Sequence, residues 1–250
     1  NAVFPNRNNF IKPFQTASGE AVYRRKINSG LFKLYGAFDT SNFELIQEDI
    51  NLPEGQYIKL NNNNFYMNGS YAGVLSDTWN IQTGFSYTHA KNKMNFGESD
   101  IRDTENSIHA KLKFKNRINN RFKLYFGAEY FATDFEEHYK DDIIENVAYG
   151  FDNNIAAAFV EADIFISKNL AFKTGLRAEY SALFEDFTLA PRVSIAYKVS
   201  PKSQLSLAYG DFYQNPTSNV LKFHQDFKPQ NTQHYILNYQ YNADRKIFRA

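Results

Sequence analysis

The stretch Phe122-Lys123-Leu124-Tyr125-Phe126-Gly127-Ala128-Glu129-Tyr130 alternates apolar and polar side chains with a period of two. In an extended chain, successive side chains point to opposite faces, so Phe122, Leu124 and Phe126 share one face with Ala128 and Tyr130. A helix would scatter the same residues around its axis. The stretch therefore predicts a β-strand with one apolar face and one polar face.

The same alternation recurs along most of the chain, clearly in the segments that begin near Trp79, Ser107, Leu170 and Arg192. We count about twelve such segments, and no segment predicts a helix of useful length. No linker divides the chain. We therefore predict an all-β antiparallel meander of about twelve strands, forming a single partial β-barrel domain over residues 1–250.

The connections between these segments alternate in length. Turn-forming residues cluster at short breaks, namely 28–30, 76–78, 119–120, 167–169, 200–202 and 242–244. Longer polar connections are expected near 39–63, 91–105, 134–153 and 215–230, with one further short turn near 185–187. Alternate turns of a meander lie at the same end, so one end carries tight turns and the other carries large loops, as in outer-membrane barrels.

Composition excludes several classes of protein. The 250 residues are 43% hydrophobic, which argues against disorder, and the net charge of +1 argues against a strongly basic nucleic-acid module. The absence of cysteine excludes a disulfide scaffold and a thiolate nucleophile. No stretch approaches the roughly 18 apolar residues of a transmembrane helix. The mean hydropathy of −0.54 suits a soluble protein, but it also suits a transmembrane barrel, whose strands alternate.

Aromatic residues favour the membrane alternative. The chain holds 17 Tyr and 24 Phe, and many lie near the ends of the apolar faces, for example at Trp79, Tyr87, Phe122, Tyr130 and Tyr239. Girdles of aromatic side chains at the membrane–water interfaces produce this distribution. A soluble sandwich would also alternate, so it stays open as the second interpretation.

Motifs for catalysis are missing. The sequence has no H-E-x-x-H, no G-x-S-x-G and no phosphate-binding loop, and its five histidines are not spaced as metal ligands. We expect no enzyme activity, no catalytic residues, no cofactor and no metal. One expected loop is rich in acidic residues, whose oxygens could hold calcium, and contains a histidine: Glu136, Glu137, His138, Asp141, Asp142 and Glu145. It lacks the pattern of an EF-hand, so we interpret it as a solvated acidic loop or a site of ligand capture.

Basic residues follow the polar face of several predicted strands. They are Lys111, Lys113, Lys115, Lys123, Arg177, Arg192 and Lys198. In a barrel lumen they could attract an anionic ligand. The favoured interpretation is that they pair with acids on the same face (Glu129, Glu161, Asp163 and Glu179) or with a further domain inside the lumen, because polar lumens are general in such barrels.

One region carries a resemblance to a known family. From Leu189 to Pro216 the sequence reads LAPRVSIAYKVSPKSQLSLAYGDFYQNP, with Pro191-Arg192, two alternating strands around a tight turn, Tyr209-Gly210, and then Tyr213-Gln214-Asn215-Pro216. Just before it, Gly175-Leu176-Arg177-Ala178-Glu179 follows a G-x-R-x-E pattern. Both stretches resemble the barrel of TonB-dependent outer-membrane receptors, in a style similar to those of Bacteroidetes-type bacteria.

The resemblance implies a function and partners. Receptors of this family have a barrel of about 22 strands closed by an N-terminal plug domain. They bind a scarce nutrient (a siderophore, a glycan or similar) and import it with energy delivered by TonB. We therefore expect an outer-membrane location in a Gram-negative bacterium, with membrane lipid, plug, TonB and nutrient as partners and no nucleic acid.

No plug-like stretch and no TonB-contacting segment is recognised in the sequence. It begins at Asn1 without a signal peptide and stops at Ala250 as a new alternation starts. We therefore expect a fragment, about half of a barrel wall, with two open sheet edges. The alternatives are a plugless outer-membrane pore or structural barrel, and a soluble glycan-binding β protein.

Overall fold

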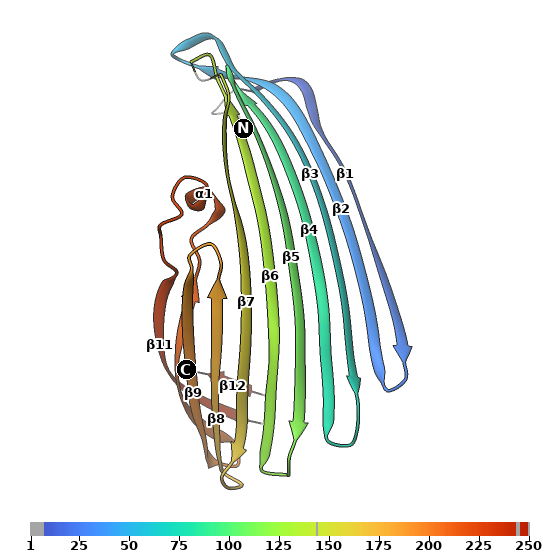
Figure 1. Ribbon diagram of the computed structural model, residues 1–250, viewed down its shortest axis with the longest axis vertical. Helices are drawn as coiled ribbons and strands as arrows, with labels where there is room; N and C mark the ends of the chain where they lie inside the picture. Colours follow the sequence, from blue (N-terminus) through green and yellow to red (C-terminus); the bar gives the residue numbers. More distant parts are fainter. Residues whose placement is uncertain (1–7, 144, 244–245, 250) are drawn as a thin grey trace.

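A computed structural model describes residues 8–143, 145–243 and 246–249, and these form one twelve-stranded antiparallel sheet (Figure 1). Each strand pairs with the next strand in the chain, which confirms the predicted meander. The strands are β1 (Asn8–Ile27), β2 (Gly30–Asp49), β3 (Leu52–Val74), β4 (Trp79–Phe96), β5 (Ser99–Arg117), β6 (Phe122–Lys140), β7 (Val147–Phe165), β8 (Leu170–Ser181), β9 (Asp186–Ser200), β10 (Ser203–Gln214), β11 (Gln230–Ala243) and β12 (Lys246–Arg249). A four-residue helix, α1 (Ser218–Leu221), lies between β10 and β11.

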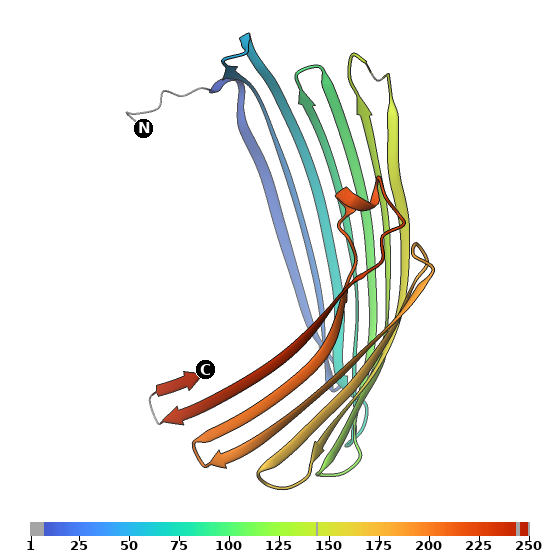
Figure 2. The ribbon, with the colours of Figure 1, turned by 90° about the vertical axis from the view of Figure 1, so that its left-hand side faces the viewer.

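The sheet curls into an open trough (Figure 2). The strands bend together around a concave side, and α1 lies on that side. A right-handed strand twist and a tilt of the strands give this curvature, as in the wall of a barrel. Lys222, directly after α1, contacts Glu137 of β6, so residues with the same alternation as Glu137 face the concave side. We call the concave side the inner wall and the convex side the outer wall.

The outer wall is apolar and open. Its side chains include Leu112, Val160 and Leu207, which are 39%, 44% and 51% exposed. A soluble sandwich would bury such a face against a second sheet. Here the described residues form a single sheet, and their buried apolar set is small: Leu45, Phe135, Phe151, Ala157, Ala190 and Leu221. The sheet therefore has the surface expected of a barrel wall that faces lipid.

Three expected long loops are wrong, because they are strand instead. β2 runs to Asp49 and β3 starts at Leu52, while β4 ends at Phe96 and β5 starts at Ser99. β6 likewise continues to Lys140. The ladder of backbone hydrogen bonds continues through these polar residues. A stretch with polar side chains on both faces is therefore a strand whose two faces both contact water, and not the end of a strand. The long connection after β10 and the short turn between β8 and β9 are confirmed.

The tight turns are made by residues suited to them. Asn28, between β1 and β2, has a φ of 51°, and Gly97, between β4 and β5, has a φ of 59°. Asparagine and glycine tolerate this left-handed conformation better than other residues. The five short breaks that fall within the described residues all lie at these strand connections. The sixth, at 242–244, reaches beyond the described residues.

We call the end of the sheet that carries the β2–β3, β4–β5 and β6–β7 connections the upper end (Figure 1). The apolar band on the outer wall has a clear limit toward this end. Below it, the row of paired residues on β3 to β6 is Met67, Tyr87, Ile108 and Ala132, and two residues higher the row is Phe65, His89, Asn106 and Asp134. About 9–11 residues of a tilted strand cross a bilayer, whereas β4 to β7 have 18 or 19 residues. In a barrel wall, the upper halves of strands this long extend beyond the lipid. Among the described residues, no helix is long and apolar enough to cross a membrane.

A cation in the middle of this band should destabilise the barrel. We expect Leu112→Arg to lower the free energy of unfolding by about 2–4 kcal/mol, because its charge would lie in lipid. Thr104→Arg is the control, on the same strand and face but above the band, with a loss of about 0–1 kcal/mol. Denaturant unfolding of the full-length protein in lipid vesicles measures both values. Equal losses would show that Leu112 does not face lipid.

Candidate functional site

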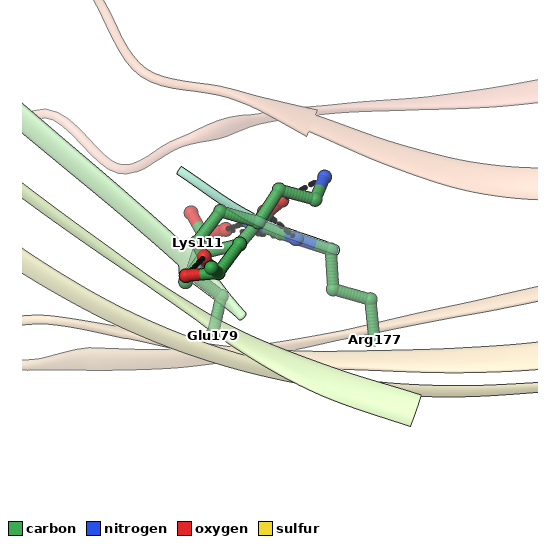
Figure 3. Close-up of polar contacts among 5 residues, drawn as sticks. Lys111, Arg177 and Glu179 are labelled. Carbon is green, nitrogen blue, oxygen red and sulfur yellow. Dashed lines mark hydrogen bonds and ion pairs between the residues drawn. The ribbon is translucent and has the colours of Figure 1, made fainter. Parts of the chain in front are cut away.

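An ion-pair cluster occupies the middle of the inner wall (Figure 3). Glu129 of β6 pairs through one carboxylate oxygen with Lys111 of β5, and through the other with Arg177 of β8 at 2.5 Å. Arg177 also binds Glu179 at 2.9 Å. The side chain of Glu129 is only 7% exposed. The cluster therefore ties three strands together with charge-assisted hydrogen bonds.

The register of the strands explains the cluster. Lys111 lies directly opposite Glu129, but β7 separates Glu129 from Arg177 on β8. On β7, Ala157 is opposite both Glu129 and Glu179. Its methyl group is small, so the guanidinium of Arg177 can cross over β7 and reach Glu129. A larger residue at this position would separate the charges.

A second polar group lies closer to the short turns. Lys173 pairs with Glu161 at 3.2 Å, and the Tyr125 hydroxyl donates to Asp163 at 3.0 Å. The ammonium groups of Lys113 and Lys115 lie 5.1 and 5.7 Å from the centre of the Tyr125 ring, within the range of a cation–π interaction.

Six of the seven predicted basic residues thus have partners on the same wall. Lys111 and Arg177 pair with acids, while Lys123 and Arg192 lie over the rings of Phe165 and Phe212 at 4.9 and 4.5 Å. Lys198 follows on β9, on the same face as Arg192. Internal pairing therefore accounts for Lys111 and Arg177 without an anionic ligand.

The acidic group is not a single loop. Glu136, Glu137 and His138 belong to β6, whereas Asp141 and Asp142 lie in the connection to β7. The strand sends Glu136 and His138 outward, where they pair at 2.9 Å, and sends Glu137 inward. The Tyr139 hydroxyl donates to Asp141 at 2.8 Å. Placing Glu136, Glu137 and His138 in a loop was wrong, since the polar strand continues above the lipid. The described residues contain no group of three or more ligands suited to a metal ion.

The family-motif residues lie side by side on three strands. Arg192 of β9 is paired with Gly175 of β8 and with Gly210 of β10. A Cβ atom at Gly210 would lie 3.2 Å from Cγ of Arg192, so glycine leaves room for this arginine to lie against Phe212. The other motif residues are Arg177 and Glu179 on β8, Pro191 on β9, Tyr209, Tyr213 and Gln214 on β10, and Pro216 just after it.

Pro191 stands at a permissive position of β9. It is opposite Leu176 on β8, but the pairing of β9 with β10 ends at Arg192, one residue away. A proline lacks an N–H group, so it is tolerated where a strand has no partner on one side.

Residues 215–229 are folded inward, which the sequence did not reveal. Leu221 of this segment is 3% exposed and packs on Phe135 and Phe151 of the inner wall. Lys222 donates to both carboxylate oxygens of Glu137 at 2.7 Å. The sequence signal was four apolar residues, Val220, Leu221, Phe223 and Phe227, within an otherwise polar connection.

A ladder of amides and carboxylates covers the inner wall above the lipid band. Asn62 donates to Asn92 at 2.5 Å, and Asn92 donates to Asp103 at 2.7 Å. Burial raises the pKa of Asp103, and the charge of nearby Glu137 adds to this shift. Closer to the turn, a hydrogen bond from Arg102 lowers the pKa of Asp100. The upper wall therefore presents hydrogen-bonding groups to the space that it encloses.

The chain belongs to a family of receptors. Residues 4–249 match the family described as TonB dependent receptor-like, beta-barrel. This is a family of outer-membrane receptors and transporters of Gram-negative bacteria, and not of enzymes. The resemblance seen in the motifs around Arg177 and Arg192 is thereby confirmed. A comparison with curated proteins found no match.

Solved structures of such receptors share the fold. The transporter YddB of Escherichia coli has a TM-score of 0.73 at 12% identity, covering 94% of this chain and 39% of its own. The ferric yersiniabactin uptake receptor FyuA of Yersinia pestis has a TM-score of 0.70 at 10% identity, with 94% and 44% covered. The ferric enterobactin receptor PfeA of Pseudomonas aeruginosa has a TM-score of 0.69 at 11% identity, covering 94% of this chain and 41% of its own. The chain thus spans less than half the length of these proteins.

Removing the central acid of the cluster should weaken the wall. We expect Glu129→Gln to lower the free energy of unfolding of the full-length protein by about 3 kcal/mol, because Lys111 and Arg177 would lose their shared partner. Glu136→Gln is the control, since the Glu136 side chain is 61% exposed, and its effect should stay within about 0.5 kcal/mol. Denaturant unfolding in vesicles measures both. A loss at Glu129 no larger than that of the control would contradict the proposed importance of the cluster.

Proposed function

We propose that this chain is part of the single barrel domain of an outer-membrane receptor that imports a scarce nutrient with energy from TonB. One observation carries the proposal: a single sheet of the receptor family has an apolar outer wall and an inner wall lined with ion pairs. Such a sheet suits lipid on one side and a hydrated lumen on the other. Its physical role is to hold the wall in lipid and to shape the lumen.

The inner wall divides into two levels with different roles. At the level of the lipid band lie the Glu129 cluster and the group around Tyr125. We assign this level to contacts with a plug domain, because its ion pairs and hydrogen-bonding side chains suit a polar partner that can be removed. Above the band, the ladder from Asn62 to Asp103 lines a vestibule open to the outside. We assign this upper level to capture of the nutrient.

The candidate ligand residues divide between these levels. Lys111, Lys113, Lys115 and Arg177 belong to the plug level, and Glu137 belongs to the vestibule. Glu136 and His138 point outward from the upper part of β6, so they would meet a ligand only at the outer surface. The proposed nutrient class is a siderophore, a glycan or a similar compound. Among the similar structures, PfeA is a ferric enterobactin receptor and FyuA is a ferric yersiniabactin uptake receptor.

Growth experiments with the full-length gene test the proposal. We expect its deletion to abolish growth on one limiting nutrient, such as a ferric siderophore or an oligosaccharide supplied alone. A plasmid copy should restore growth in cells with TonB and fail in cells without it. Restored growth in cells lacking TonB would contradict the receptor function and favour a passive pore. A protein extracted without detergent would instead favour a soluble binding protein.

A further inference from the structure

The connection between β10 and β11 is attached to the inner wall by side chains. We call residues 215–229 the lid segment. Leu221 fills a small apolar site made by Phe135, Phe151, Leu183 and Phe184. Phe223 packs edge-on against Tyr149, with ring centres 4.7 Å apart. Both contacts lie on β6, β7 and the turn after β8, so the segment reaches from its own strands past this turn to the middle strands of the sheet.

A nearly buried ion pair fixes the segment at one point. The side chains of Lys222 and Glu137 are 11% and 10% exposed, and both carboxylate oxygens accept from the ammonium at 2.7 Å. Asp103 on β5 adds a second negative charge nearby. A buried charge is costly without its partner, so this pair favours one docked position of the segment strongly over partly displaced ones.

The backbone of the segment, by contrast, is independent of the wall. Within residues 215–229, the backbone-to-backbone hydrogen bonds join 217–224 to one another, around α1. A single side-chain bond reaches wall backbone, from Gln225 to the carbonyl of Gly150 at 3.0 Å. Pro216 and Pro229 stand at the two ends, where they stop the strands from extending into the segment. The segment can therefore leave the wall as a unit without breaking the sheet.

Its place in the trough gives this movement a consequence. β8 to β11 are shorter than β1 to β7, and the segment folds inward below the outer ends of the long strands (Figure 1; Figure 2). It thus covers the inner wall of β6 and β7 between the outer ends of these strands and the level of the Glu129 cluster. Docked, it takes up space beside β6 and β7 that undocking would clear.

We propose that residues 215–229 form a lid inside the vestibule, held closed by the Lys222–Glu137 ion pair, and that the lid opens to let a ligand pass toward the lumen. What passes rests on the proposed receptor function. The closed and open states of the lid do not, and they can be measured on the purified full-length protein alone.

Thiol accessibility tests the closed state. The chain has no cysteine, so Leu221→Cys, at a position that is 3% exposed, reports lifting of the lid through its reaction with a bulky maleimide. We expect the reaction in detergent micelles to be at least about tenfold faster when Lys222→Met or Glu137→Gln is added, because one charge is then unpaired. Lys228→Met, in the same segment, is the matched control and should leave the rate unchanged.

A double variant distinguishes loss of the ion pair from general damage to the fold. The pair Lys222→Met with Glu137→Leu replaces the ion pair by an apolar contact and should return the rate close to that of the parent. Heat-dependent mobility of the barrel in gels verifies folding of every variant. Rates that stay within twofold of the control in both single variants would overturn the latch. A fast rate in the parent itself would show that the lid is not closed.

A reversible cross-link tests whether opening matters. Tyr149→Cys with Phe223→Cys places two thiols at neighbouring positions of the lid and the wall. We expect oxidation of this pair to block growth on the nutrient, and a reductant to restore it, while Phe223→Cys alone grows under both conditions. Normal growth of the oxidised pair would overturn the role of the lid in passage. Failure of the parent to grow on any nutrient would overturn the receptor function and leave the thiol rates as the measure of the lid.

Discussion

Backbone hydrogen bonding is the constraint on which this structure depends. Within lipid no water can satisfy an N–H or C=O group, so every strand must pair on both sides along its length. The chain meets this demand in the simplest way, by pairing each strand with the next. Prolines occur where the ladder permits them, as at Pro13, in a register shift of β1, and at Pro191, beyond the pairing with β10. The ladder of backbone hydrogen bonds also continues above the apolar band, so the long strands extend the sheet beyond the part that lipid would cover.

The two walls of the sheet follow from this ladder and the alternation along each strand. Apolar side chains gather outside, where lipid replaces the second layer that a soluble sheet would need. Charged side chains gather inside, where they are close enough to pair across neighbouring strands, and Ala157 allows one pair to form across an intervening strand. The inner wall is consequently a connected polar surface rather than a set of separate solvated charges.

The alternation around Phe122 to Tyr130 was sufficient to predict the strands, the meander and the inward position of the charged residues. It failed at Asn61 to Asn64, because both faces are polar there and period two gives no contrast, although β3 continues through them. The pairing of Lys222 with Glu137 joins residues 85 positions apart. Local patterns carry no information on such a contact. The sequence showed the acidic residues near Glu137 as a cluster. Only the structure showed that they alternate along β6, so that Glu137 faces the inner wall while Glu136 and His138 face the outer wall.

The strict order of neighbours along the sheet has a consequence for assembly. Because each strand meets only the strands before and after it in the chain, the sheet can grow by adding one hairpin at a time to an edge that already exists. Each step closes only a short loop, so its entropic cost is small. The segment around Lys222 is the exception, since it reaches back to β6 after four further strands. In this order of assembly the strands on which it docks, β6 and β7, are already paired when the segment is added.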